Sequence, residues 1–352
     1  MLRRLRNRIY SDPRFQRWAS SFPLTRRIAR KHANAVFDLT AGFVYSRVLE
    51  ACFSLNLLER VRDEAMSVAD LASELDLPLD GCERLLEAAA GIELVERDRS
   101  GRYGLGSFGA LVLGHPGLKA MVLHHRLLHR DLQDPVALLR REHKTELRAF
   151  WTYAGSEDAL MREEYSALMS DSLRMLSADV LRAFPMDRFE HVMDLGGGDG
   201  TFLRAVAEHA PHVRCTLFDL PEVAAMARER SGDSIDVVAG NLFEDPLPTG
   251  ADCITLVRVL LDHGDESARA ILVAARKAIA PGGTVVVAEP MRNTGARRMT
   301  DTYFGVYLWA MGQGQTRTPQ AVAELLRDAG FRAPRAVPSH RSLSCHLVVA
   351  RA

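Results

Sequence analysis

A glycine-rich turn constrains the fold more than any other feature of this chain. An apolar run ends at Asp194 and then turns through glycines at alternate positions, which are Gly196, Gly198 and Gly200. Because glycine adopts positive φ angles and has no side chain, such a turn between a strand and a helix brings backbone N–H groups close to a ligand. A dinucleotide-binding turn needs its third glycine five residues after the first, where this chain has Thr201. The turn therefore predicts either a nucleotide-like ligand other than a dinucleotide or a purely structural connection.

From residue 191 onward the hydrophobic pattern alternates between strands and helices. Strands are predicted near residues 191–195, 213–218, 235–239, 251–257, 284–289, 331–337 and 344–350. Helices are predicted near residues 201–209, 221–230, 265–280 and 318–329. This alternation predicts an α/β fold with a doubly wound, mostly parallel, seven-stranded sheet. Because the last two strands arrive consecutively, we expect them to form an antiparallel hairpin.

The region before the sheet has the pattern of a winged helix. Residues 36–60 show the apolar spacing of one long amphipathic helix. Two shorter helices follow. The first runs from Ser67, which caps it, to Leu75. The second runs from Asp80 to Ala90 and starts with Asp80-x-x-Glu83, which resembles a capping box. Residues 94–105 then predict a β-hairpin.

Charge argues against DNA binding by this winged helix. Its second helix carries Asp80, Glu83 and Glu87 against only Arg84. A net-acidic helix releases no phosphate counterions and is repelled from a major groove. Its apolar faces therefore favour subunit packing over a nucleic-acid partner.

The N-terminus carries a concentrated positive charge although the whole chain is neutral, with 45 basic and 45 acidic residues. Residues 1–31 hold ten basic side chains and one acidic side chain, Asp12, and aromatic and aliphatic residues lie between the arginines. This mixture suits an anionic membrane surface or a partner protein. The alternative is a solvated arm that caps the fold.

Composition indicates a soluble protein of the reducing cytoplasm. Hydrophobic residues make up 47% of the 352 residues, but no run reaches the length of about 18 that a spanning helix needs, and no apolar core of a signal peptide follows the N-terminal arginines. The five cysteines are scattered without a CxxC pair, which favours neither a disulfide framework nor a metal site.

The carboxyl ends of the predicted strands carry polar residues, and ligands of open α/β sheets bind there. Asp219 lies 23 residues after Gly196, where an acidic side chain accepts ribose hydroxyls, although it is also placed to cap the helix that begins at Pro221. Asn241 is placed to bond an adenine amine, with apolar ring contacts from Leu242 and Phe243. The next two strands end at residues 258–266 and 288–291.

These strand ends resemble a known family. The segments are residues 194–200, Phe218-Asp219-Leu220-Pro221, residues 240–248, residues 260–266, Pro281-Gly282-Gly283 and Ala288-Glu289-Pro290-Met291. Together they resemble the class II, plant-type small-molecule O-methyltransferases, which use S-adenosyl-L-methionine (SAM). Residues 15–26, 37–46 and 301–305 resemble the bacterial carotenoid branch of that family, the demethylspheroidene and hydroxyneurosporene O-methyltransferases.

The resemblance covers residues 36–352 and implies four parts. They are a basic amphipathic arm (1–35), a winged-helix-like dimerisation domain (36–115), a helical connector with substrate-pocket helices (116–185) and a Rossmann-like SAM-binding methyltransferase domain (186–352). It also implies a homodimer that uses no metal, releases S-adenosyl-L-homocysteine and methylates the tertiary C1 hydroxyl of an acyclic hydroxycarotenoid. The SAM-binding residues that it implies are Asp194, Gly196, Gly198, Gly200, Asp219, Leu220, Asn241, Leu242, Phe243 and Arg258.

The chain departs from the family at two positions. Asn241 stands where the family usually has aspartate, and Leu261 stands where it usually has a catalytic histidine. His263, beside Asp262, is the first candidate for a replacement base; the others are His124, His125 and Tyr303. Alternatively, in-line positioning in a dry pocket supplies the acceleration without a base.

A long lipophilic substrate needs an apolar channel. We expect it to be lined by Phe150, Trp151, Met161, Tyr165, Met169, Tyr303, Phe304, Tyr307 and Met311. The alternative substrates are a polyketide, a phenol or a bacteriochlorophyll-type ring, and the alternative function is a non-catalytic SAM-binding protein. An enzyme that draws a carotenoid from a membrane benefits from docking on anionic lipid, which gives the basic arm a role at the periphery of a photosynthetic membrane.

Overall fold

The computed structural model describes residues 2–115, 117–153, 170, 173–174, 176–294, 298–337 and 345–352. The chain divides into two compact units, Met1–Leu113 and Gly114–Ala352.

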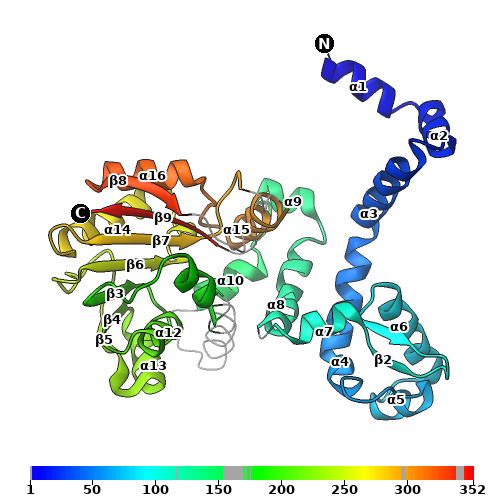
Figure 1. The fold of residues 1–352 in the computed structure, drawn as a ribbon, viewed down its shortest axis with the longest axis horizontal. Helices are drawn as coiled ribbons and strands as arrows, with labels where there is room; N and C mark the ends of the chain where they lie inside the picture. The colour runs from blue at the N-terminus through cyan, green and yellow to red at the C-terminus, as the bar shows by residue number, and fades with distance from the viewer. Residues whose placement is uncertain are drawn as a thin grey trace. The chain divides into compact units, whose positions relative to one another are not determined.

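The first unit is helical with a small hairpin (Figure 1). Its elements are α1 (Leu2–Tyr10), α2 (Pro13–Ser21), α3 (Arg26–Ser54), α4 (Leu57–Arg60), α5 (Val68–Glu74), α6 (Leu79–Gly91), β1 (Val95–Arg97), β2 (Tyr103–Leu105) and α7 (Ser107–Leu113). Helices α5 and α6 followed by the antiparallel β1–β2 pair form the predicted winged helix. Ser67 caps α5 as predicted, because its side chain accepts a hydrogen bond from the Asp70 N–H at 3.2 Å.

Two local predictions for this unit are wrong. The single helix predicted over residues 36–60 begins earlier, at Arg26, and ends at Ser54, because Asn56 adopts a left-handed φ of 53° that separates α3 from α4. The capping box at Asp80 is not formed. Helix α6 begins one residue earlier after Pro78, and the Asp80 carboxylate accepts a bond from the N–H of Gly81 instead.

The second unit begins with helices and continues into the sheet (Figure 1). Its described helices before the sheet include α8 (Leu118–Asp131), α9 (Pro135–Arg140) and α10 (Glu146–Tyr153), and residues 176–183 are also helical. The strands are β3 (His191–Leu195), β4 (Arg214–Asp219), β5 (Asp236–Ala239), β6 (Cys253–Val257), β7 (Thr284–Glu289), β8 (Arg332–Val337) and β9 (His346–Arg351). The helices between them are α12 (Thr201–His209), α13 (Pro221–Ser231), α14 (Asp265–Ala278), α15 (Gly305–Met311) and α16 (Pro319–Asp328), with a π-helical stretch at Arg298–Phe304 before α15.

The sheet has the strand order β5-β4-β3-β6-β7-β9-β8. Its first five strands are parallel, and β9 runs antiparallel to both β7 and β8, so the predicted fold class and the final hairpin are confirmed. The chain moves outward from β3 through β4 to β5 and then returns to start β6 beside β3. The carboxyl ends of β3 and β6 thus form the topological switch point, where ligands of such sheets bind.

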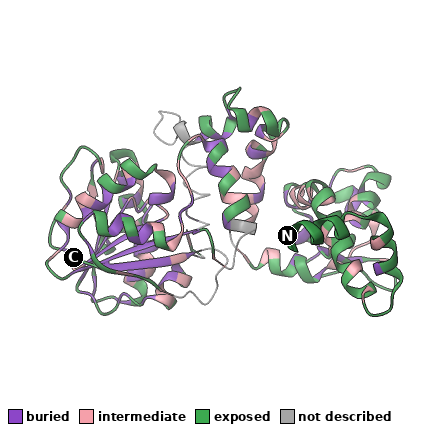
Figure 2. Cartoon of the chain, turned by 90° about the horizontal axis from the view of Figure 1, so that it is seen from above, coloured by how far each residue is buried: buried purple, intermediate pink, exposed green. Residues whose placement is uncertain are grey.

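Apolar side chains fill both faces of the sheet. One core cluster joins the strands to α14 and α16, and the other joins them to α12 and α13. Strands β3, β6 and β7 are buried along their full length, as Figure 2 shows in purple between the greener outer helix faces. Such strands are expected at the centre of a parallel sheet covered on both sides.

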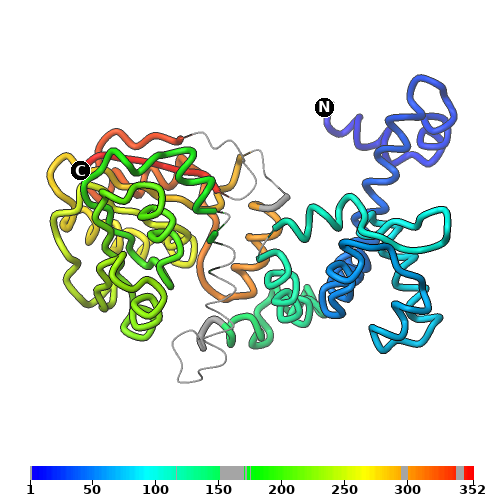
Figure 3. The backbone as a smooth tube through the Cα atoms, turned by 60° about the horizontal axis from the view of Figure 1, so that its bottom comes forward, coloured from blue at the N-terminus to red at the C-terminus, as the bar shows by residue number. Residues whose placement is uncertain are grey.

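Helices α8, α10 and α15 pack against one another as a helical layer of the second unit (Figure 3). Leu261, which follows β6, is buried in the same apolar cluster as Leu128 of α8 and Tyr307 of α15. This layer therefore covers the segment that follows β6. No helix among the described residues is both long enough and apolar enough to cross a membrane.

Candidate functional site

The glycine turn has the conformation that its sequence predicts. Gly196, Gly198 and Gly200 have φ angles of 67°, 62° and 81°, which residues with a side chain rarely adopt. A Cβ atom on Gly198 would meet no atom within 4 Å, so this glycine faces open space, whereas a Cβ on Gly196 would lie 3.1 Å from Val259. Gly200 then forms the N-cap of α12. The turn presents bare backbone at the switch point.

Asp194 lies beneath this turn and is almost fully buried. Its Oδ1 accepts a hydrogen bond from the Thr255 hydroxyl at 2.5 Å, which ties β3 to β6. Its Oδ2 would lie 2.7 Å from a Cβ on Gly197, so the carboxylate supports the turn from below. Burial raises the pKa of Asp194 to about 7, and the nearby Asp219 adds to this effect.

Asp219 joins the end of β4 to the turn. Its Oδ2 accepts a hydrogen bond from the Gly198 N–H at 2.8 Å, and its Oδ1 accepts one from the Leu220 N–H at 2.7 Å. Asp219 does not cap α13, because the N-cap of that helix is Leu220, which makes no side-chain cap bond. Burial raises the pKa of Asp219 to about 6. Each carboxylate oxygen retains a further lone pair for a hydroxyl donor.

Apolar side chains are exposed beside Asp219. Leu220, after β4, is 41% exposed, and Phe243, after β5, is 51% exposed. Asn241 shapes the loop that carries Phe243, because its Oδ1 accepts from the Phe243 N–H at 3.0 Å and its own N–H donates to Asp245. The ring of His263 meets the ring of Phe243 edge-on, with centroids 5.5 Å apart. These side chains offer apolar contacts next to the Asp219 carboxylate.

The segment after β6 is held by two buried charged residues that the sequence analysis did not assign to the site. Glu289, at the end of β7, accepts a hydrogen bond from the Leu261 N–H at 2.9 Å. Arg317, only 2% exposed, donates to the carbonyls of Leu260 at 2.6 Å and His263 at 2.7 Å. No local pattern marks Arg317, because its partners lie more than 50 residues away in the chain.

Burial shifts the pKa values of the titratable groups in this segment so that their uncharged forms are favoured. It raises the pKa of Asp262 to about 7, with Arg258 opposing the shift, and that of Glu289 to about 7, with Arg317 opposing. Burial, aided by the charge of Arg317, lowers the pKa of His263 below its ordinary value. Several titratable groups with shifted pKa values in one place are typical of a functional site.

Two histidine–tyrosine pairs lie in the helical layer that covers Leu261. His125 Nε2 lies 2.7 Å from the Tyr303 hydroxyl, and His124 Nε2 lies 2.8 Å from the Tyr307 hydroxyl. Tyr303 and Tyr307 both contact the apolar cluster that contains Leu261. The two pairs are therefore matched in chemistry: both histidines come from α8, and the tyrosines come from the π-helical stretch and from α15, which follows it directly.

The structure gathers several of the residues predicted to line the substrate channel. Phe150 packs on the ring of His124 with centroids 4.8 Å apart, and Tyr303 and Phe304 meet edge-on at 5.0 Å. Tyr307 and Met311 are buried in the same cluster. Trp151 lies on α10, but its side chain is outside the described parts of the chain. Three further residues, Met161, Tyr165 and Met169, also lie outside the described residues.

Comparisons with known proteins agree with this arrangement. Residues 129–332 match the family model of an O-methyltransferase domain, and residues 37–114 match that of an O-methyltransferase dimerisation domain. The chain is 41% identical over 360 residues to a protein of Cereibacter sphaeroides named demethylspheroidene O-methyltransferase, covering 99% of this chain and 95% of the relative. It is 40% identical over 330 residues to a Rhodobacter capsulatus protein of the same name, covering 92% and 83%. The structure of human N-acetylserotonin methyltransferase in complex with SAM superposes with a TM-score of 0.78 at 25% identity, covering 91% of this chain and 97% of that chain.

Proposed function

The chain belongs to the O-methyltransferase family that carries an N-terminal dimerisation domain, and we propose that it methylates the tertiary C1 hydroxyl of an acyclic hydroxycarotenoid. It is a SAM-dependent enzyme. The observation that carries the carotenoid substrate is the identity of about 40%, over nearly the whole chain, with two relatives named demethylspheroidene O-methyltransferase. The substrate is therefore of the demethylspheroidene or hydroxyneurosporene type.

Residues at the switch point fit SAM. Asp219 has free lone pairs for the ribose hydroxyls, and the bare backbone at Gly198 admits close approach. Phe243 and Leu220 offer exposed apolar faces for the adenine, and Asn241 lies at the base of the same loop. When bound, SAM supplies a methyl group that is made electrophilic by its sulfonium. The remaining residues of this proposed site are Asp194, Gly196, Gly200, Leu242 and Arg258.

The strand order supports one orientation of SAM. Asp219 ends β4 and Phe243 follows β5, so the adenosine would lie on the β4–β5 side of the switch point. The methyl-bearing end would then lie toward the ends of β3 and β6. There Leu261 packs under the helical layer of α8, α10 and α15, so the substrate hydroxyl approaches from that layer.

We propose two candidates for the proton acceptor that replaces the missing histidine at position 261. His263 with Asp262 is the candidate from the sequence, and its ring packs against Phe243 on the side proposed for adenine. Tyr303 with His125 is the candidate that the helical layer offers, since Tyr303 borders the Leu261 cluster. In the second arrangement the substrate hydroxyl gives its proton to Tyr303 while Tyr303 passes its own proton to His125.

The substrate is tested by incubating the purified protein with SAM and either 1-hydroxyneurosporene or demethylspheroidene. We expect a product heavier by one methylene group and one equivalent of S-adenosyl-L-homocysteine. Methylation of phenols or polyketides with no carotenoid product would instead support the alternative substrates. SAM binding without transfer to any acceptor would support a non-catalytic SAM-binding protein.

The N-terminal arm fits an anionic membrane surface. Residues 1–31 include ten basic side chains and one acidic side chain, and Leu2 and Leu24 are 85% and 80% exposed. An apolar groove of about 1,080 Å³ lies between α1, α2 and α3 and is lined by Tyr10, Phe15 and Ile28 among others. Basic residues beside exposed apolar ones favour insertion at a lipid headgroup boundary. We therefore propose that the arm docks the dimer on the membrane that holds the carotenoid.

A further inference from the structure

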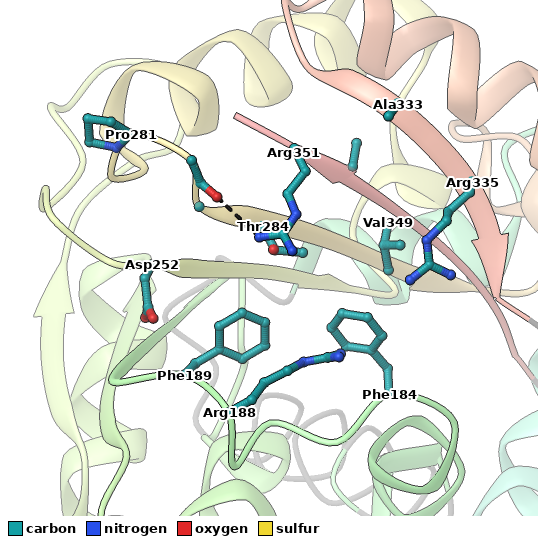
Figure 4. A pocket seen from close by; sticks show the side chains of 13 residues that line it. Phe184, Arg188, Phe189, Asp252, Pro281, Thr284, Ala333, Arg335, Val349 and Arg351 are labelled. Atoms are coloured by element: carbon teal, nitrogen blue, oxygen red, sulfur yellow. Dashed lines mark hydrogen bonds between the residues drawn. The ribbon is translucent and has the colours of Figure 1, made fainter.

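A second cavity lies at the amino ends of the parallel strands, opposite to their carboxyl ends, where the glycine turn lies. It has a volume of about 360 Å³ and is lined by the amino ends of β6 and β7, the carboxyl end of β9, part of β8 and the segment before β3 (Figure 4). Because the strands separate it from the carboxyl-end site, it is not part of the proposed SAM or carotenoid site. Its size falls within the range of about 300–1,000 Å³ that is usual for small-molecule pockets.

Three arginines from three different elements line this cavity. Arg188 comes from the segment before β3, Arg335 from β8 and Arg351 from β9. Within the described parts of the chain, no carboxylate forms an ion pair with any of them. Guanidinium groups gathered without counter-charges repel one another, and an anionic ligand relieves this repulsion.

Among the described residues that line the cavity, the one carboxylate is already bonded to the backbone. Asp252 accepts hydrogen bonds from the N–H groups of Glu190 at 3.1 Å and His191 at 2.8 Å. These bonds anchor the segment that carries Arg188. The described lining therefore has three positive side chains and one negative side chain, and both oxygens of that carboxylate already accept hydrogen bonds from backbone N–H groups.

Two phenylalanine rings fix the orientation of Arg188. Its guanidinium lies 3.8 Å from the ring centroid of Phe184 and 5.2 Å from that of Phe189. Figure 4 shows Arg188 extended along these rings and Arg335 reaching from β8 toward the same space. When the flat face of a guanidinium stacks on an aromatic ring, its N–H groups point outward in the guanidinium plane. They can therefore still donate hydrogen bonds to an oxyanion.

The strand pair behind the cavity carries a like-charge pair and a backbone irregularity on the edge strand β8. Arg332 and Arg351 are direct cross-strand partners, and like charges in that position destabilise a sheet. The register shifts between Arg332 and Arg335, and Ala333, which lines the cavity, has a φ of 48°. Bulges of this kind redirect side chains near ligand sites.

We infer that this cavity binds the phosphate group of a small molecule through Arg188, Arg335 and Arg351. Phosphate matches the forked N–H groups of several arginines at once and carries more charge than a carboxylate. The phosphate comes either from a free metabolite or from an anionic lipid headgroup. Arg351 already donates one N–H to the carbonyl of Gly282 at 3.2 Å, so Arg188 and Arg335 are the residues to replace.

The first test is calorimetric titration of the full-length protein with inorganic diphosphate at low ionic strength. We expect one saturable site per chain, whose affinity falls at least tenfold in Arg188→Gln and in Arg335→Gln. Arg327→Gln is the matched control, since Arg327 is an exposed arginine of α16 outside the cavity lining. Retained SAM binding shows that each variant is folded, and Arg335, exposed on an edge strand, is the safer of the two replacements.

The second test identifies the source of the phosphate. Vesicles of phosphatidylcholine with and without phosphatidic acid are sedimented with full-length protein in which Arg3, Arg4, Arg6 and Arg8 of the N-terminal arm are glutamine, and with its Arg188→Gln and Arg335→Gln variants, so that the arm does not mask binding at the cavity. Loss of the phosphatidate-dependent fraction in Arg188→Gln and Arg335→Gln identifies a headgroup, and an unchanged fraction with arginine-dependent diphosphate binding identifies a free metabolite. The proposal is overturned if neither diphosphate nor phosphatidate binding depends on these arginines. Carotenoid methylation is assayed separately, so failure of one proposal leaves the other intact.

Discussion

Asp219 accepts a hydrogen bond from the backbone N–H of Gly198 at 2.8 Å. This contact connects the end of β4 to the middle of the glycine turn, 21 residues earlier in the chain. It fixes the position of the carboxylate before any ligand arrives, so little ordering is needed when the ribose hydroxyls bind. Pre-organisation of this kind reduces the free-energy cost of binding.

We expect Asp219→Asn to weaken SAM binding roughly 10- to 100-fold, the usual value of a hydrogen bond to a charged acceptor. The asparagine keeps the size of the side chain, but it loses the charge and replaces one acceptor oxygen by an N–H₂ group that faces the Gly198 N–H. Calorimetric titration with SAM measures the change. Asp233→Asn, at an exposed position after α13, is the control, and equal SAM affinity in both variants would remove Asp219 from the site.

SAM binding should also weaken at acidic pH. Burial raises the pKa of Asp219 to about 6, so the carboxylate is protonated as the pH falls through that value. The protonated form accepts ribose hydroxyls poorly. We therefore expect SAM affinity at pH 5 to be roughly tenfold lower than at pH 8, with a smaller pH dependence in Asp219→Asn.

We expect Tyr303→Phe to lower kcat by about 100-fold, a typical contribution of general acid–base catalysis. The variant removes the hydroxyl that lies 2.7 Å from His125 and leaves the ring in the apolar cluster. The KM for SAM should stay unchanged, since Tyr303 packs against the Leu261 cluster and is not among the residues proposed to hold SAM. Tyr307→Phe is the matched control, because it breaks the equivalent pair with His124.

The same assay separates the two candidate acceptors. If Tyr303 and His125 act together, His125→Gln reproduces the fall in kcat and the double variant adds little to it. His263→Ala then raises the KM for SAM, because its ring packs on Phe243, and has a smaller effect on kcat. A large loss of kcat in His263→Ala, with Tyr303→Phe fully active, would instead make His263 the acceptor.

The sequence predicted those parts of the site that depend on short-range spacing. The glycine turn and Asp219 were found because a parallel sheet brings consecutive strand ends to one edge. Arg317 was missed because its bonds to Leu260 and His263 depend on the packing of a distant segment. Glu289 stood in a recognised motif, but only the structure shows that it bonds the Leu261 N–H.

The errors in the fold have a similar origin. The hydrophobic periodicity of residues 36–60 continues across Asn56, so it gave no sign that this residue adopts a left-handed conformation. The Asp80-x-x-Glu83 pattern satisfies the rule for a capping box, but the helix starts before it, after Pro78. In both cases the backbone at one residue, the left-handed Asn56 or the extended Pro78, set a helix boundary that the side-chain pattern did not indicate.

We expect the N-terminal arm to bind vesicles that contain anionic lipid, and to bind neutral vesicles weakly. Each basic side chain near such a surface contributes about 1 kcal/mol. Replacing Arg3, Arg4, Arg6 and Arg8 of α1 by glutamine should abolish most of this binding, which sedimentation measures. Methylation of a detergent-solubilised carotenoid should be unchanged, while methylation of a vesicle-borne carotenoid falls. Equal vesicle binding by both proteins would contradict the membrane role.

Glu289→Gln should stabilise the second unit at neutral pH but not at pH 4. Burial raises the folded-state pKa of Glu289 to about 7, above an unfolded value of about 4.3. Between these values the folded protein holds a proton that the unfolded chain releases, so stability falls as the pH rises through this window and then levels off. Glutamine keeps an acceptor for the Leu261 N–H and places no charge beside the Oε1 position, which lacks a hydrogen-bond partner.

The free energy of unfolding of Glu289→Gln, compared with that of the unmodified protein, should therefore increase between pH 4 and pH 7. The expected gain is on the order of 1–3 kcal/mol, since each pKa unit corresponds to about 1.4 kcal/mol. Urea unfolding at several pH values measures it, and the transition that SAM shifts identifies the second unit. A constant difference across this range would mean that Glu289 ionises in the folded protein as it does in the unfolded chain. Arg317, which opposes the shift, and the hydrogen bonds to the carboxylate would then offset the effect of burial.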